Sequence, residues 1–214
     1  MEIKVVRNIL EANDRIAAQN RDLFTEKGIY VLNLMGSPGA GKTSLLERTL
    51  EHLKKRRKIA VIEGDIETSR DAERIAHFNI PIVQINTGGA CHLDGNMVRG
   101  SLAELSLDHL DLLIVENVGN LVCPAEFQFG ENDRAMILSV TEGDDKPMKY
   151  PLMFQVSSVL LLNKVDLIPY LDFDMERFQA DALKVNPKLQ IMAVSCKTGE
   201  GLNAWFGWIE GQLA

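Results

Sequence analysis

Apolar and polar positions fall into blocks along this chain, with short apolar runs separated by stretches of helical spacing. The runs are rich in Val, Ile and Leu without strict alternation, as expected for parallel strands covered on both faces. They occupy 30–35, 58–63, 80–85, 111–116, 134–140, 158–163 and 189–194. Crossover helices are predicted between them at 42–57, 69–78, 95–106, 174–185 and 200–212. The order predicts an α/β fold with a doubly wound, mostly parallel sheet.

Two further segments complete this pattern. Residues 3–27 form an amphipathic helix that ends at Gly28, and we expect it to pack on the domain's own sheet. The alternative is that this helix is an arm that binds a partner. The interval 117–133 separates two strands without a convincing helix, and loops of that length are often functional. Without repeats or linkers, the chain is predicted to be a single domain over 1–214.

Composition and charge narrow the possible functions. Hydrophobic residues make up 46% and charged residues 25%, which allows a sizeable core. The 23 basic and 30 acidic residues give a net charge of −7, which argues against a nucleic-acid binder. Three cysteines suggest reduced thiols rather than a disulfide framework. Neither an apolar signal-peptide core nor a membrane span is evident, so we expect a soluble, cytoplasmic protein.

A glycine-rich loop of the pattern G-x-x-x-x-G-K-[ST] follows the first predicted strand. Its backbone N–H groups and the next helix's N-terminus bind phosphate oxygens. Lys42 is a predicted catalytic residue because it places a charge at the β- and γ-phosphates, and Thr43 offers a hydroxyl to Mg²⁺. The predicted phosphate site comprises Gly36, Ser37, Pro38, Gly39, Ala40, Gly41, Lys42, Thr43 and Ser44.

A predicted guanine site follows the last two strands. The sixth run ends in N-K-x-D, whose Asp can accept hydrogen bonds from guanine N1–H and its exocyclic amine. Adenine lacks that pair of donors. The seventh run is followed by a segment similar to the S-A-K of GTPases, with Cys in place of Ala. The predicted base site comprises Asn163, Lys164, Asp166, Ser195, Cys196 and Lys197.

Acidic residues follow two other strands on the edge that should face the phosphates. Glu116 ends one strand and is a better magnesium-side acid than Asp111, which begins it. Asp65 is the preferred second acid, near Mg²⁺ or the attacking water, and so a second predicted catalytic residue. The alternative is that Asp65 belongs to an acidic helix N-terminus, where it complements the helix dipole. The sequence has no obvious strong general base, which fits phosphoryl transfer by positioning and charge neutralisation.

A second metal site is suggested by Cys91, His92 and Cys123, which lie just beyond two strands. Two thiolates and an imidazole suit zinc or nickel. Cys91 and His92 can share a metal only in a bent loop, which Gly88 and Gly89 permit. Alternatively, these cysteines are small buried residues.

Several segments together resemble the hydrogenase nickel-incorporation GTPase family (HypB), over nearly the whole chain. They are GSPGAGKT, EGDIETSRDAERI, NTGGACHLDGNMV, ENVGNLVCP, TEGDDKPMKYP, NKVDL and SCKTGEG. The resemblance implies a P-loop NTPase of the nucleotide-dimerising GTPase class, with GTP or GDP and Mg²⁺. It also implies that Cys91, His92 and Cys123 bind nickel or zinc at a subunit interface.

The expected function is therefore a GTP-hydrolysing metallochaperone for NiFe-hydrogenase maturation. The resemblance implies a homodimer promoted by GTP and metal, a smaller nickel-binding accessory protein and the hydrogenase large-subunit precursor as partners. Some family members add an N-terminal cysteine cluster or histidine-rich stretch. This sequence starts MEIKVV and has four histidines, so no separate nickel store is expected. The alternatives are a GTPase assembly or signalling module with a structural zinc site, and a P-loop small-molecule kinase.

Overall fold

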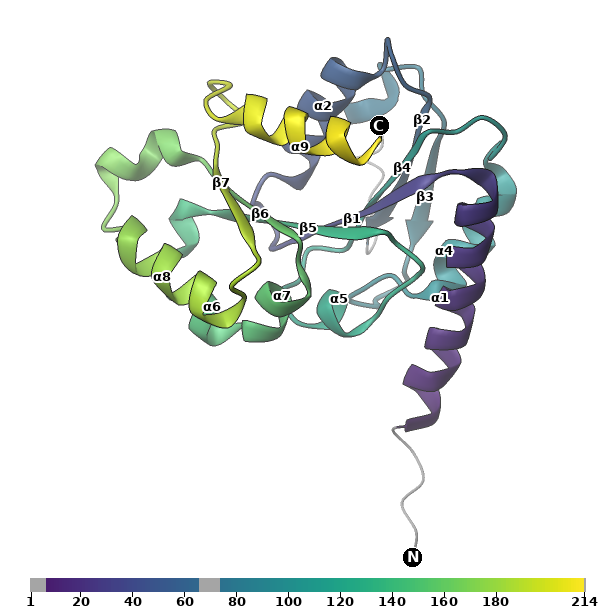
Figure 1. Ribbon diagram of the computed structural model, residues 1–214, viewed down its shortest axis with the longest axis horizontal. Helices are drawn as coiled ribbons and strands as arrows, with labels where there is room; N and C mark the ends of the chain where they lie inside the picture. Colours follow the sequence, from purple (N-terminus) through teal and green to yellow (C-terminus); the bar gives the residue numbers. More distant parts are fainter. Residues whose placement is uncertain (1–6, 66–73, 214) are drawn as a thin grey trace, which may run out of the picture.

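Seven strands form the centre of the molecule in the computed structural model, which describes residues 7–65 and 74–213 (Figure 1). Each coincides with a predicted apolar run to within two residues at either end. The strands are β1 (Tyr30–Gly36), β2 (Ile59–Asp65), β3 (Ile82–Asn86), β4 (Leu112–Glu116), β5 (Asp133–Ser139), β6 (Val159–Asn163) and β7 (Gln190–Ala193).

The strands are ordered β3-β2-β4-β1-β5-β6-β7, and every pairing between them is parallel. This confirms the predicted doubly wound sheet. β1 lies at the centre, where Leu34 is opposite Glu116 of β4 and Gly36 is opposite Ile137 of β5. Because the strands are parallel, the carboxyl ends of β1, β2, β4 and β6 share one edge, where ligands of open α/β sheets bind.

The helices differ more from the sequence prediction than the strands do. The longer ones are α1 (Arg7–Lys27), α2 (Lys42–Leu53), α4 (Gly95–Ser101), α8 (Met175–Val185) and α9 (Leu202–Gln212). Shorter ones are η1 (Leu102–Glu104), α5 (Cys123–Glu126), η2 (Val140–Glu142), α6 (Lys146–Lys149), α7 (Pro151–Val156) and η3 (Val165–Tyr170). Residues 3–6 of the first predicted helix and residues 69–73 of predicted helix 69–78 lie outside the described residues, and residues 74–76 are helical.

Two predictions about the connections are corrected. The interval 117–133 contains the short helix α5. Pro124 lies in its first turn, where a backbone N–H has no partner within the helix, so the missing N–H of proline costs no hydrogen bond. The connection between β5 and β6 contains α6 and α7, each with a proline in its first turn, and the sequence pattern did not predict them.

Three apolar clusters cover the sheet. α2 and α9 pack on one side through Leu46 and Trp205. On the other side, α1 and α4 contribute Phe24 and Val98, while α7 and α8 contribute further aromatic residues. The described part of the N-terminal helix thus packs against the sheet through Phe24. None of the described helices is long and apolar enough to cross a membrane.

Candidate functional site

The predicted phosphate loop lies between β1 and α2, at the carboxyl edge of the sheet. Gly41 has a φ of 109°, and a Cβ there would lie 2.3 Å from Nδ2 of Asn163. That amide donates to the Ala40 carbonyl at 2.9 Å. Nζ of Lys164, the next residue, donates to the Gly39 carbonyl at 2.8 Å. The N-K-x-D segment therefore supports the phosphate loop as well as lining the predicted base site.

The predicted magnesium ligands Thr43 and Glu116 are in contact. Thr43 Oγ1 donates to Glu116 Oε1 at 3.0 Å, and the Glu116 carboxylate is only 3% exposed. Both line a cavity of about 510 Å³ together with Lys42, Ser44 and Asp65, which ends β2. A hydroxyl and carboxylates on one wall match the oxygen ligands that Mg²⁺ prefers. These residues therefore fit a magnesium ion beside the phosphates.

A second cavity, of about 560 Å³, adjoins the first and is lined by the predicted base-site residues. Ser195 Oγ donates to Asp166 Oδ1 at 2.6 Å, and the Cys196 N–H donates to Asn163 Oδ1 at 3.0 Å. These contacts join the two predicted motifs and fix the Asp166 carboxylate. Gly41, Ser44 and Lys164 line both cavities, so the two are continuous. The base-site residues lining the larger cavity are Asn163, Lys164, Asp166, Ser195, Cys196 and Lys197.

Cys196 differs from the other two cysteines in its surroundings. It is 8% exposed, and burial raises the pKa of its thiol to about 11. The thiol is neutral near pH 7 and acts as a small side chain in the wall of the cavity.

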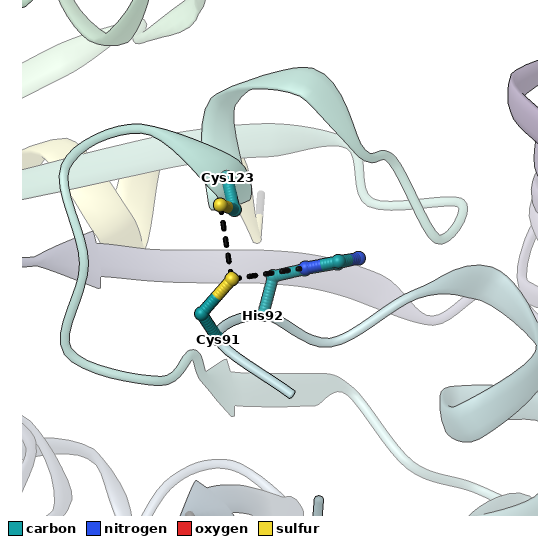
Figure 2. Close-up of side chains that lie close together, drawn as sticks. All are labelled: Cys91, His92 and Cys123. Atoms are coloured by element: carbon teal, nitrogen blue, oxygen red, sulfur yellow. Dashed lines mark hydrogen bonds between the residues drawn. The ribbon is translucent and has the colours of Figure 1, made fainter. Parts of the chain in front are cut away.

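The three predicted ligands of the transition metal converge, and no other group of three potential ligands does so within residues 7–65 and 74–213. Their ligand atoms all lie within 4.8 Å of one another. The Cys91 thiol donates to Cys123 Sγ at 3.0 Å and lies 3.8 Å from His92 Nδ1. Figure 2 shows the two sulfur atoms pointing toward each other, with the His92 ring to one side. The loop is bent as predicted, with a φ of 60° at Gly88 and 103° at Gly89.

The surroundings of these ligands shift the pKa of His92 downward and the pKa of Cys123 upward. Burial lowers the pKa of His92, so the ring is neutral and keeps a lone pair for a metal. The His92 ring also stacks on Phe127, with centroids 3.9 Å apart. The hydrogen bond from Cys91, together with burial, raises the pKa of the Cys123 thiol. A metal ion must displace the proton from that thiol to bind it.

The loop after β4 connects the two predicted sites, and its asparagines were not identified from the sequence. Asn117 Oδ1 accepts from the N–H of Leu93, the residue after His92, at 3.0 Å. The Asn120 N–H donates to the carbonyl of Gly36 in the phosphate loop at 3.1 Å. The sequence feature that could have identified them is a pair of asparagines, three residues apart, directly after a buried strand.

Comparison with known proteins decides the family. Residues 30–193 match the CobW/HypB/UreG nucleotide-binding domain. Hydrogenase maturation factor HypB of Azotobacter vinelandii is 54% identical over 210 residues, which cover 98% of this chain and 69% of that protein. The chain belongs to the HypB family of hydrogenase maturation factors. The resemblance of the sequence motifs to HypB is thereby confirmed.

Solved HypB structures share the fold. HypB from Archaeoglobus fulgidus has a TM-score of 0.89 and 41% identity, covering 95% of this chain and 100% of that one. HypB from Helicobacter pylori, solved in complex with nickel, also has a TM-score of 0.89, with 37% identity, covering 94% and 95% of the two chains. Members of the family share a nucleotide-binding domain, and one of them was solved in complex with nickel.

Proposed function

We propose that this protein is a GTP-hydrolysing metallochaperone that binds nickel and assists its insertion into NiFe-hydrogenase. The observation that carries the proposal is that the ligand atoms of Cys91, His92 and Cys123 lie within 4.8 Å of one another, at a site that Asn120 joins to the phosphate loop. Two thiolates and one imidazole form a donor set that nickel accepts. The nickel complex of the Helicobacter pylori HypB supports the same cargo.

In the proposed hydrolysis, the chain positions GTP and neutralises the charge that develops on its phosphates. Lys42 stabilises the oxygens of the β- and γ-phosphates, and backbone N–H groups of the loop bind the remaining ones. Magnesium, when bound, neutralises developing charge on the phosphates, and Thr43 and Glu116 would hold it. Asp65, at the wall of the same cavity, orients the attacking water.

Guanine selectivity is assigned to Asp166. Its carboxylate is oriented by Ser195 and lines the cavity next to the phosphate loop. A guanine base there would satisfy the carboxylate with its N1–H and amine, whereas adenine would leave it without those donors. The same cavity argues against a small-molecule kinase that uses ATP.

The cargo site is proposed to lie at a subunit interface. Three ligands leave room for a fourth, and a two-fold related copy would bring the same thiols to the partner's site. We further propose a smaller nickel-binding accessory protein and the hydrogenase large-subunit precursor as partners. Zinc at the same ligands, with a purely structural role, is the competing assignment.

The test combines metal titration with nucleotide turnover. Wild type should bind Ni²⁺, Cys91→Ser and Cys123→Ser should lose that binding, and Cys196→Ala should keep it as the matched cysteine control. GTP should yield phosphate with water as the sole acceptor, and ATP should not be hydrolysed at a comparable rate. Absence of nickel binding, or a zinc ion whose removal unfolds the protein, would favour the structural-zinc alternative.

A further inference from the structure

Helix α1 is hydrogen-bonded to both of the segments that carry the predicted metal ligands. Asn13 is 8% exposed, and its Oδ1 accepts from the N–H of Gly95, three residues after His92, at 2.8 Å. Its Nδ2 donates to the carbonyl of Gln128 at 2.8 Å. Gln128 directly follows Phe127, whose ring stacks on His92. One side chain of α1 thus joins the segment after His92 to the segment after Cys123.

Asn20, two helical turns further along α1, repeats this arrangement. Its side chain is fully buried, and its Nδ2 donates to the carbonyls of both Gly95 and Phe129 at 2.9 Å. Its Oδ1 accepts from Arg99 of α4 at 3.2 Å. Each amide therefore contacts the same two segments. Figure 1 shows α1 lying along α4.

Each of the two segments contacts α1 through a glycine, because a side chain at that position would be too close to the helix. A Cβ on Gly95 would lie 3.1 Å from Asn13 Oδ1 and 3.2 Å from the nitrogen of Ala17. A Cβ on Gly130 would lie 2.8 Å from the Ala17 carbonyl oxygen and from the nitrogen of Arg21. Both contacts surround Ala17, midway between the two asparagines. Gly95 and Gly130 therefore permit the approach that the hydrogen bonds require.

We propose that Asn13 and Asn20 are positioning residues for the metal site, which hold the His92 and Cys123 segments at the separation that metal binding needs. The inference rests on the proposed function, since it assumes that Cys91, His92 and Cys123 bind nickel. Neither asparagine contacts a ligand atom. They act through the start of α4 and through Phe127, which fixes the His92 ring from the Cys123 side.

Packing alone does not account for these two amides. The α1 face already contributes Phe24 to the apolar cluster with Leu93 and Phe129. Buried polar side chains are unfavourable unless they are hydrogen-bonded, and their directional bonds specify one arrangement of the groups they join. Here the groups joined are the backbone polar atoms that flank the two halves of a metal site.

The test replaces each amide and measures nickel binding, nucleotide binding and stability in the full chain. Asn13→Ala and Asn20→Ala should weaken Ni²⁺ affinity by about tenfold or more, as for other residues that orient metal ligands. The nickel–thiolate charge-transfer absorption should also change in position or intensity. GDP affinity should stay near that of wild type, because neither residue lines the two nucleotide cavities.

Asn186 provides a matched control. Its Nδ2 also donates to two backbone carbonyls, those of Phe154 at 2.9 Å and Ser157 at 3.0 Å, in the α7–α8 region of the molecule. Asn186→Ala should lower the melting temperature but leave nickel affinity and the charge-transfer band unchanged. Should Asn20→Ala fail to fold, Asn13→Asp remains informative, because it keeps the acceptor for Gly95 and removes the donor to Gln128.

The outcomes distinguish failure of the positioning role from failure of the proposed function. If wild type binds nickel and folded Asn13 and Asn20 variants bind it with the same affinity and absorption, the positioning role is wrong while the proposed function stands. The positioning role is also wrong if Asn186→Ala weakens nickel binding equally. If wild type itself does not bind nickel, the proposed function fails first.

Discussion

The Asn120 side-chain amide donates to the carbonyl oxygen of Cys91 at 3.3 Å. Because the backbone N–H of the same residue donates to Gly36, Asn120 joins the loop of a predicted metal ligand to the phosphate loop. The segment that contains Asn120 begins after Glu116, beside Thr43, and ends at Cys123. The two proposed activities therefore share one short stretch of chain.

Lys42→Ala should reduce GTP hydrolysis by about 100- to 1,000-fold, as expected when a group that stabilises transition-state charge is removed. Lys42 is a buried side chain, only 8% exposed. Its Nζ donates weakly to the Ser37 carbonyl at 3.4 Å, so we expect the fold to survive. Phosphate release should be measured beside a melting curve, with exposed Lys188→Ala as control. Near-normal turnover in a folded variant would refute the phosphate-site assignment.

Asp166→Asn should weaken GTP binding by at least about tenfold, or about 1.4 kcal/mol, and improve binding of xanthosine triphosphate. The physical reason is that an amide can donate to the extra carbonyl of xanthine, whereas the carboxylate cannot. Competition between the two nucleotides for a fluorescent analogue measures the change. Unaltered GTP affinity in the variant would show that the base lies elsewhere.

The sequence predicted the strands and the local motifs because each depends on neighbouring residues. A buried parallel strand is a run of apolar residues, and the phosphate loop is a single continuous segment. The short helices α6 and α7 were not predicted because prolines and short length leave no helical period to detect. The roles of Asn13 and Asn120 were not predicted either, because the hydrogen-bond partners of these amides lie far away in sequence.

Asp144→Asn should remove an acid-sensitive contribution to stability. The N–H of Asp174 and the Arg177 guanidinium hydrogen-bond to the Asp144 carboxylate and lower its pKa from 3.8. A carboxyl whose pKa is lowered in the folded state stabilises the fold above its unfolded pKa, and loses that effect as pH falls through the folded pKa.

At pH 7 the Asp144 variant should lose about 1–2 kcal/mol of unfolding free energy. The difference from wild type should shrink as the pH is lowered below about 4, where the unfolded carboxyl begins to take up protons. Melting temperatures across that range measure it, and exposed Asp172→Asn should show no comparable loss at pH 7. A wild-type advantage that does not shrink as the pH falls below about 4 would contradict the assignment.

Dimerisation should be promoted by GTP and metal if the cargo site is shared. An isologous pair would bring both copies of Cys91 and Cys123 together, so the metal would link the subunits. Sedimentation with a GTP analogue, Mg²⁺ and Ni²⁺ should show dimer, and Cys123→Ser should remain largely monomeric under the same conditions. Monomer alone for wild type would exclude the shared site.

Nickel affinity should depend on the nucleotide, because the segment between Glu116 and Cys123 contacts the phosphate loop. A Cβ on Gly119 would lie 2.9 Å from Cγ of Pro38, so this glycine lies directly against the loop. Loss of the γ-phosphate would shift that contact and move Cys123 relative to Cys91. Nickel(II), with its geometric preference, should respond more sharply than zinc.

We expect a coupling of about 1–3 kcal/mol, or roughly 5- to 150-fold in nickel affinity between the GDP state and a non-hydrolysable GTP state. Gly119→Ala pushes the segment away from Pro38 and should reduce that ratio toward one. Gly207→Ala in α9 is the matched control, since a Cβ there meets nothing within 4 Å, and it should leave the ratio unchanged. By linkage, nickel should alter the relative affinity for the two nucleotides by the same factor. Equal nickel affinities in the two wild-type states would reject the coupling and leave Cys91, His92 and Cys123 as a passive carrier site.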